Sequence, residues 1–167
     1  QPENEDGWSF QTKRGIVATP LLHNDKIFFG SKDGTFYAVD INTHEAVWTY
    51  EVGNPIHGKA AILDNTVFFS CADVFYALDI NTGNELWVYD LEQDSTKTKR
   101  KDDWDYHDAT PVIDRGVVYF GCCTGGIRGF EAATGELVWE FDVDTNIPVR
   151  STPLIYEDVL YYGDWNG

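Results

Sequence analysis

Four short segments of the chain are runs of consecutive apolar residues. A strand with one face in water alternates apolar and polar residues, whereas a strand covered on both faces does not. A further apolar stretch and then a polar turn precede each run. For the first run the apolar stretch is residues 18–22 and the turn is residues 23–25. The pattern therefore predicts four buried strands with a neighbour before each, at 26–30, 66–70, 117–121 and 159–163.

The stretch that follows the first buried strand, residues 35–48, reads as a strand, a tight turn and a second strand. Residues 76–87 repeat it almost letter for letter, and residues 129–139 repeat it with Glu131 in place of the aspartate. Recurrence at a nearly constant period is typical of repeat architectures. The repeat therefore defines the register of the rest of the chain.

The turn inside this repeat combines an aspartate with a glycine. Asp40 and Asp79 can accept hydrogen bonds from backbone N–H groups further along the turn. Gly83 and Gly135 can adopt a positive φ without strain, and His44 stands at this position in the first copy. We expect His44 to adopt the same backbone conformation at a cost of about 1 kcal/mol.

Each copy of the repeat ends in a tryptophan, and one more tryptophan precedes the first copy. An indole has a large apolar face and a single N–H, which suits docking on an adjacent layer. We predict that the last three are buried between layers. The docking residues are Trp8, Trp48, Trp87 and Trp139.

Four short antiparallel strands in each repeat of about 40 residues, covered on both faces, predict an all-β fold of β-propeller blades. A solenoid of stacked sheets is the alternative. The chain would form a single partial propeller domain, about half of a seven- or eight-bladed ring, with residues 90–107 as an inserted loop. The three full repeats and the partial blade lie approximately at 9–48, 49–87, 88–139 and 140–167.

Three further expectations follow from this repeat. Asp33-Gly34 is expected to form a two-residue hairpin turn, and residues 8–10 the last strand of a preceding blade. Both ends of such an arc would leave an apolar blade face bare, which soluble monomers avoid. We therefore expect a longer native polypeptide, or a second copy, to supply the remaining blades.

The chain is strongly acidic, with a net charge of −16 and a pI near 4.3. Such a surface repels nucleic acid phosphates and anionic membranes. No apolar run reaches the ~20 residues of a membrane helix, and no secretory signal is visible. The four histidines lack a ligand spacing such as His-x-x-x-His. We expect no nucleic acid partner, no membrane insertion and no metal site.

The segment 77–87 reads Ala-x-Asp-x-x-Thr-Gly-x-x-x-Trp, and 38–48 differs from it by His44. This pattern resembles the tryptophan-docking motif of the pyrroloquinoline-quinone-type propellers, a quinoprotein-like family. The resemblance covers nearly the whole chain and implies a propeller of four-stranded blades. It does not choose a chemistry, because the family contains quinone-dependent alcohol dehydrogenases as well as propellers without a cofactor.

Residues 102–106, Asp-Asp-Trp-Asp-Tyr, resemble the dehydrogenase segment that carries the catalytic aspartate. The resemblance implies that Asp105 would take the alcohol proton beside a calcium-bound quinone. Those enzymes also contain a vicinal disulfide, but Cys122 and Cys123 follow a predicted strand, at a place unlike that of the family pair. We predict a free, mostly buried pair of thiols and no bond between Cys71 and Cys122.

A possible ligand site emerges when the repeats are aligned on the residues at the start of their innermost strands. These residues are Pro20, Ala60, Pro111 and Pro153. His57, Asp108 and Arg150 each lie three positions upstream of these residues and are predicted to face one channel on consecutive blades. Lys59 and His107 lie close to this ring in sequence. The same residues could instead form a salt bridge between blades.

The sequence thus supports two functional hypotheses. The preferred one is a non-enzymatic propeller that acts outside the cytoplasm, in the periplasm, at the cell surface or secreted, and binds a protein or saccharide partner. It requires no cofactor. The alternative is a fragment of a dehydrogenase that depends on pyrroloquinoline quinone and calcium, with Asp105 as its base.

Overall fold

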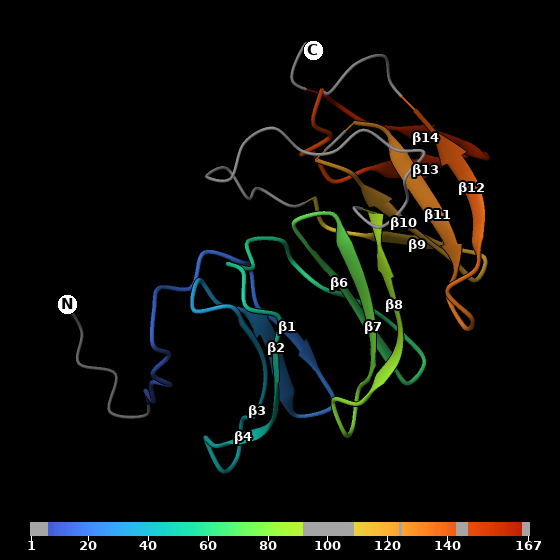
Figure 1. Cartoon of the computed structure of the whole chain (residues 1–167). Coiled ribbons are helices and arrows are strands. Elements are labelled where there is room, and N and C mark those ends of the chain that lie inside the picture. Colours follow the sequence, from blue (N-terminus) through green and yellow to red (C-terminus); the bar gives the residue numbers. More distant parts are fainter. Residues whose placement is uncertain (1–6, 92–108, 124, 143–146, 165–167) are drawn as a thin grey trace.

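A computed structural model describes residues 7–91, 109–123, 125–142 and 147–164. In these residues three four-stranded antiparallel sheets and one two-stranded sheet follow one another along the chain. Figure 1 shows them side by side in sequence order, from β1–β4 to β13–β14. This arrangement confirms the expected all-β architecture of successive propeller blades.

Within each sheet the strands are neighbours in sequence order, so every connection is a hairpin. Blade one contains β1 (Leu21–His23), β2 (Lys26–Gly30), β3 (Thr35–Asp40) and β4 (Ala46–Glu51). Blade two contains β5 (Ala61–Leu63), β6 (Thr66–Cys71), β7 (Val74–Asp79) and β8 (Glu85–Asp90). Blade three contains β9 (Val112–Asp114), β10 (Val117–Gly121), β11 (Ile127–Glu131) and β12 (Leu137–Phe141). The two-stranded sheet contains β13 (Leu154–Tyr156) and β14 (Val159–Tyr161).

In blades one to three the second strand is largely covered on both faces, as its unbroken apolar run predicted. The predicted burial is wrong for residues 159–163, since Val159 and Tyr161 of β14 are 48% and 52% exposed. Val67, Phe68 and Phe69 in β6 are all completely buried. Phe69 stacks on Phe36 of blade one with the ring centroids 4.2 Å apart, and Phe68 packs in the cluster that joins blades two and three. Burying a large apolar side chain contributes about 1.5–3 kcal/mol, so these sheet-to-sheet contacts are the main source of stability.

The hairpin between the second and third strands differs between blades. In blade one it has four residues, 31–34, because Ser31 N–H bonds to Thr35 O and Gly34 N–H bonds to Ser31 O. The prediction of a two-residue turn at Asp33-Gly34 is therefore wrong. Blade two lacks one residue here, and Ala72 and Asp73 form a two-residue turn with φ of 52° and 63°.

The turn between the third and fourth strands agrees with the prediction. Asp79 Oδ1 accepts hydrogen bonds from Asn81 N–H at 3.0 Å and from Thr82 N–H at 2.9 Å. His44 adopts a φ of 63°, close to the 73° of Gly83. The turn geometry is therefore kept even where glycine is replaced.

This turn has a consequence for acid stability. Hydrogen bonds from Thr82 and Asn81 lower the pKa of Asp79. Because the folded pKa lies below the unfolded value of about 3.9, the stabilisation is complete above that pH and is lost as the pH falls below it. We expect Asp79→Asn to lower the free energy of unfolding at pH 7 and to flatten its decline below about pH 4.

Urea unfolding at a series of pH values measures this effect, with Glu45→Gln, an exposed carboxylate in the preceding blade, as the matched control. An unchanged acid limb in Asp79→Asn would show that the turn does not contribute to acid sensitivity.

The tryptophans of blades one and two contact the turn of the following blade. Trp48 is 8% exposed and donates from Nε1 to Ile80 O at 3.1 Å. Trp87 is half-buried and donates to Ala132 O at 2.9 Å. Trp139 is 39% exposed. The predicted burial is wrong for Trp139, because the described part of the fourth blade contains no turn between a third and a fourth strand.

The N-terminal tryptophan contacts blade one. Trp8 stacks on the imidazole of His44 with the ring centroids 4.5 Å apart, at the position where Gly83 and Gly135 lie in the later turns. Residues 8–10 do not form the expected strand, since no described residue supplies a hydrogen-bonded neighbour on that side. They cover the blade with side chains only, and Phe10 packs on Phe29 and Tyr37.

The glycine beneath Trp48 provides a test of this contact. A Cβ on Gly83 would lie 2.7 Å from the indole ring, whereas a Cβ on Gly53, which also has a positive φ, would meet nothing within 4 Å. Gly53→Ala is expected to cost about 1 kcal/mol from backbone strain alone. We expect Gly83→Ala to cost about 1–2 kcal/mol more than this control in denaturant titrations, because it overpacks the ring. Equal losses would show that the ring yields freely.

Candidate functional site

The hairpins between the second and third strands lie on the same side of the blades as the connections from one blade to the next. Ile56 N–H bonds to Ser31 O at 3.1 Å, and Val149 N–H bonds to Cys122 O at 3.1 Å. Leu91 N–H bonds in the same way to the hairpin of blade two. We call this side the hairpin face, formed by residues 31–34, 72–73, 122–123 and 125–126 and by the described parts of the connections that contact them.

Two of the predicted ligand residues lie on this face. His57 directly follows Ile56, and Arg150 directly follows Val149, so both occupy equivalent places in their connections. Ile56 and Val149 are completely buried, and the side chains of His57 and Arg150 are half-buried. The structure therefore anchors the backbone beside each predicted residue.

The other predicted residues of the ring and the proposed base lie outside the described residues. They are Asp105, His107 and Asp108. Convergence of His57, Asp108 and Arg150 on one channel therefore stays a prediction.

Lys59 lines a groove of about 480 Å³ along the innermost strands of three blades. Its wall combines apolar residues with polar groups from His23, Asp64 and Thr110. A groove of this size, mostly apolar with a few polar groups, has the dimensions of a ligand site. Neither His57 nor Arg150 belongs to its lining, so the structure separates Lys59 from the other candidates.

Arg128 in β11 was not singled out in the sequence, although it lies on the hairpin face and is only 2% exposed. In the repeat it aligns with Tyr37 of blade one and Tyr76 of blade two. The replacement of a tyrosine by an arginine at this position was the signal in the sequence that could have identified Arg128. A buried guanidinium is costly unless its N–H groups are satisfied.

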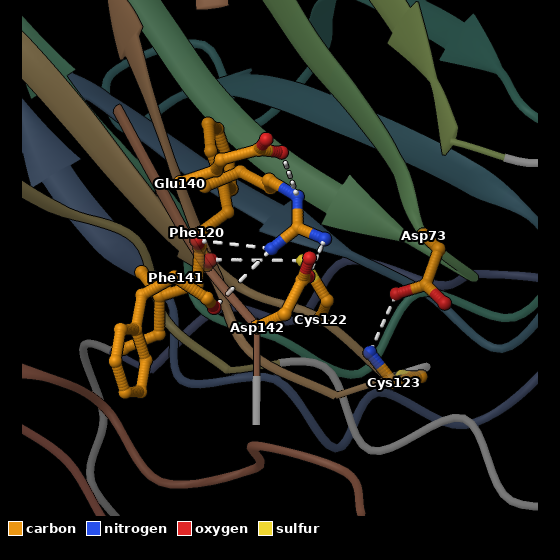
Figure 2. Close-up of polar contacts among 9 residues, drawn as sticks. Asp73, Phe120, Cys122, Cys123, Glu140, Phe141 and Asp142 are labelled. Carbon is orange, nitrogen blue, oxygen red and sulfur yellow. Dashed lines mark hydrogen bonds and ion pairs between the residues drawn. The ribbon is translucent and has the colours of Figure 1, made fainter. Parts of the chain in front are cut away.

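The partners of Arg128 come from its own strand and from the end of β12. Its Nη1 donates to Ile127 O at 3.1 Å and to Phe141 O at 3.3 Å, and its Nη2 pairs with Asp142. Its Nε lies 3.6 Å from Glu140 Oε2. Figure 2 shows Glu140, Phe141 and Asp142 around this group. The guanidinium thus attaches the end of β12 to the blade.

Asp73 joins the hairpins of blades two and three. Its carboxylate is 2% exposed and accepts a hydrogen bond from Cys123 N–H at 2.5 Å (Figure 2). Cys71, Cys122 and Cys123 are all buried, and none of the three forms a disulfide. The burial predicted for Cys122 and Cys123, without a disulfide, is what the structure contains.

The hairpin of blade one contains a stabilised carboxylate. Burial raises the pKa of Asp33, but hydrogen bonds from Tyr37 Oη, Ser31, Thr35 N–H and Lys13 N–H together lower it below its ordinary value. The Tyr37 Oη to Asp33 Oδ2 distance is 2.9 Å. Asp33 is therefore ionised at neutral pH and contributes negative charge to the hairpin face.

Two negative findings concern only the described part of the chain. There, no three His, Cys, Asp or Glu side chains come together in a way that could hold a metal ion. The same residues include no helix with the length and apolarity needed to cross a membrane.

The successive four-stranded blades, with a tryptophan of one blade bonded to the turn of the next, define the class of PQQ-type β-propeller repeats. A family model described as "Outer membrane protein assembly factor BamB" matches residues 1–167. The chain belongs to this family. No curated protein sequence matches it.

Solved structures of known proteins share this fold. The crystal structure of BamB from Moraxella catarrhalis superposes with a TM-score of 0.75 at 22% identity, over 95% of this chain and 46% of that one. A quinohemoprotein alcohol dehydrogenase, ADHIIG from Pseudomonas putida HK5, gives 0.73 at 16% identity, over 93% and 29%. The computationally designed Ika4 protein gives 0.70 at 17%, over 94% and 89%. The chain therefore spans less than half the length of either natural protein.

Proposed function

We propose that the chain is part of a non-enzymatic propeller that binds a protein or saccharide partner on its hairpin face. The observation that carries the proposal is the match of the whole chain to a family described as an outer membrane protein assembly factor. That description also supports a location outside the cytoplasm, in the periplasm, at the cell surface or secreted.

The geometry of the hairpin face is consistent with binding. It presents the ionised Asp33 together with His57 and Arg150, and their backbones are held by buried neighbours. Loops fixed on a rigid scaffold are common sites of recognition. A face that combines both charges suits a polar, specific partner, since charge complementarity contributes more to specificity than to affinity.

Site-specific photo-crosslinking in cells tests this proposal in the full polypeptide that contains the chain. Crosslinkers at positions 57 and 150 sample the hairpin face, and crosslinkers at positions 42 and 81 sample exposed turns at the opposite ends of the strands. We expect discrete adducts from 57 and 150 only. Equal adducts from all four positions, or none from 57 and 150, would contradict the proposal.

The second candidate function is a quinone-dependent alcohol dehydrogenase with Asp105 as its base. The superposition on a quinohemoprotein alcohol dehydrogenase and the segment 102–106 favour it. Asp105 lies outside the described residues, and those residues do not gather a ligand set for calcium. They therefore give no basis for a catalytic step through the quinone.

An absorbance titration of the full polypeptide with pyrroloquinoline quinone and calcium separates the two functions. The binding function predicts no saturable change. Saturable binding that Asp105→Ala abolishes would replace it with the enzymatic one.

A further inference from the structure

Blade two departs from the repeat at the start of its innermost strand. In residues 19–21, 110–112 and 152–154 this place reads Thr-Pro and then leucine or valine. In residues 59–61 it reads Lys-Ala-Ala. Blade two therefore has a cation in place of threonine, a residue with a backbone N–H in place of proline, and a methyl group in place of a larger aliphatic side chain.

All three substituted residues line the groove of about 480 Å³ along the innermost strands, which we call the Lys59 groove. Leu21 of blade one and Pro111 of blade three flank it. Alanine at positions 60 and 61 leaves space that proline and leucine would fill. The substitutions therefore open the groove over blade two.

The exchange of proline for alanine also introduces a backbone donor. Leu63 pairs with Thr66 across a two-residue turn, and hydrogen-bonded pairs alternate with non-bonded ones along an antiparallel ladder. The backbone groups of Ile62 and Ala60 therefore point away from β6, to the free edge of β5. Ala60 is 3% exposed, and its N–H donates to no described residue. Buried N–H groups without an acceptor are rare, so a ligand with an acceptor here is favoured.

The two ends of the Lys59 groove carry opposite charges. Lys59 is half-buried just before β5, and Asp64 is exposed just after it. Among the described residues neither side chain has an ion-pair partner. The five residue steps between them span about 17 Å in an extended chain. An extended ligand with an anion at one end and a cation at the other would complement both.

We propose that the Lys59 groove binds a short extended peptide of about five residues, the number that matches this span, with both termini free. Its terminal carboxylate pairs with Lys59 and its terminal ammonium with Asp64. This orientation is antiparallel to β5, so the peptide backbone can exchange hydrogen bonds with Ile62 and accept one from Ala60 N–H. The site is separate from the hairpin face and does not rest on the function proposed for that face.

Calorimetric titration of the full polypeptide that contains the chain, with the peptide Ala-Val-Ala-Val-Ala, tests the proposal. We expect saturable binding by the peptide with free termini. Amidation of its carboxyl end or acetylation of its amino end should each weaken binding by at least about tenfold, because each removes a charged group that the groove complements.

Two protein variants assign these charges to their partners. Lys59→Gln should weaken binding of the free peptide by about tenfold and leave binding of the amidated peptide unchanged. Asp64→Asn should do the same with the acetylated peptide as the unaffected ligand. Lys32→Gln and Glu45→Gln, which make the same charge changes at exposed positions outside the groove, are the matched controls and should bind the free peptide normally.

Ala60→Pro tests the backbone contact. It restores the residue of the other three copies and is therefore expected to fold. Binding of the free peptide should fall about tenfold, since the proline ring removes the donor and fills part of the groove. Ala60→Gly, which keeps the N–H, should bind normally. Absence of saturable binding, equal affinity for the free and capped peptides, or unchanged binding by Ala60→Pro would overturn the proposal.

Discussion

Replacing Trp48 by alanine is expected to lower the free energy of unfolding by about 3–5 kcal/mol. The side chain is 8% exposed, and its N–H donates to Ile80 O in the next blade. The variant therefore loses the apolar contact between two sheets and leaves a buried carbonyl without its donor. Chemical denaturation followed by circular dichroism measures the loss.

Val47→Ala is the matched control for Trp48→Ala, since Val47 precedes it in β4 and is 46% exposed. Its cost should stay below about 1 kcal/mol, as for most surface substitutions. A loss of less than 1 kcal/mol in Trp48→Ala would show that the blades are held together without the indole. In the Trp48→Ala background, Gly83→Ala should lose its excess cost, because the ring that meets the new methyl is gone.

Replacing Arg128 by alanine is expected to destabilise the chain by about 3 kcal/mol, because it removes a large buried side chain and breaks its ion pair. The guanidinium is 2% exposed, and its loss removes its hydrogen bond to Phe141 O and its ion pair with Asp142. Since Asp142 is 59% exposed and can be hydrated, the cost falls at the low end for a broken buried pair. Urea titration measures it directly.

Glu140→Ala is the control that separates the effect of the buried Arg128 guanidinium from the effect of its ion pair with Glu140. Glu140 is 45% exposed and its carboxylate lies 3.6 Å from Arg128 Nε, so its removal should cost less than about 1 kcal/mol. Similar losses in Arg128→Ala and Glu140→Ala would mean that the pair matters and the buried guanidinium does not.

The repeated pattern of the sequence was enough to predict the blades, because it reflects local requirements. Strands buried on both faces need unbroken apolar runs, and the turn at Asp79 needs a carboxylate and a residue that tolerates positive φ. His44, with φ of 63°, shows that the register of the repeat predicted even an unfavourable conformation. The hairpin at 31–34 was mispredicted because its length depends on which backbone groups pair, and a dipeptide does not specify this.

The candidate site was only partly predictable. Alignment of the repeats placed His57 and Arg150 at equivalent positions, since equivalent residues of a repeat occupy equivalent places in the fold. Alignment could not show that Lys59 lines a separate groove along three blades, because that groove is made by residues far apart in the sequence. It also could not show that Arg128 is buried, since an arginine in a strand is equally compatible with an exposed face.

By itself, the sequence determined the fold class, the repeat register and the conformation of the turns between the third and fourth strands, all of which depend on neighbours within about one blade. Only the tertiary structure decided which tryptophans are buried. Trp48 and Trp139 end nearly identical motifs, yet one is enclosed and the other is 39% exposed. The physical reason is that burial depends on the turn presented by the following blade, and a motif cannot encode a partner that lies outside it.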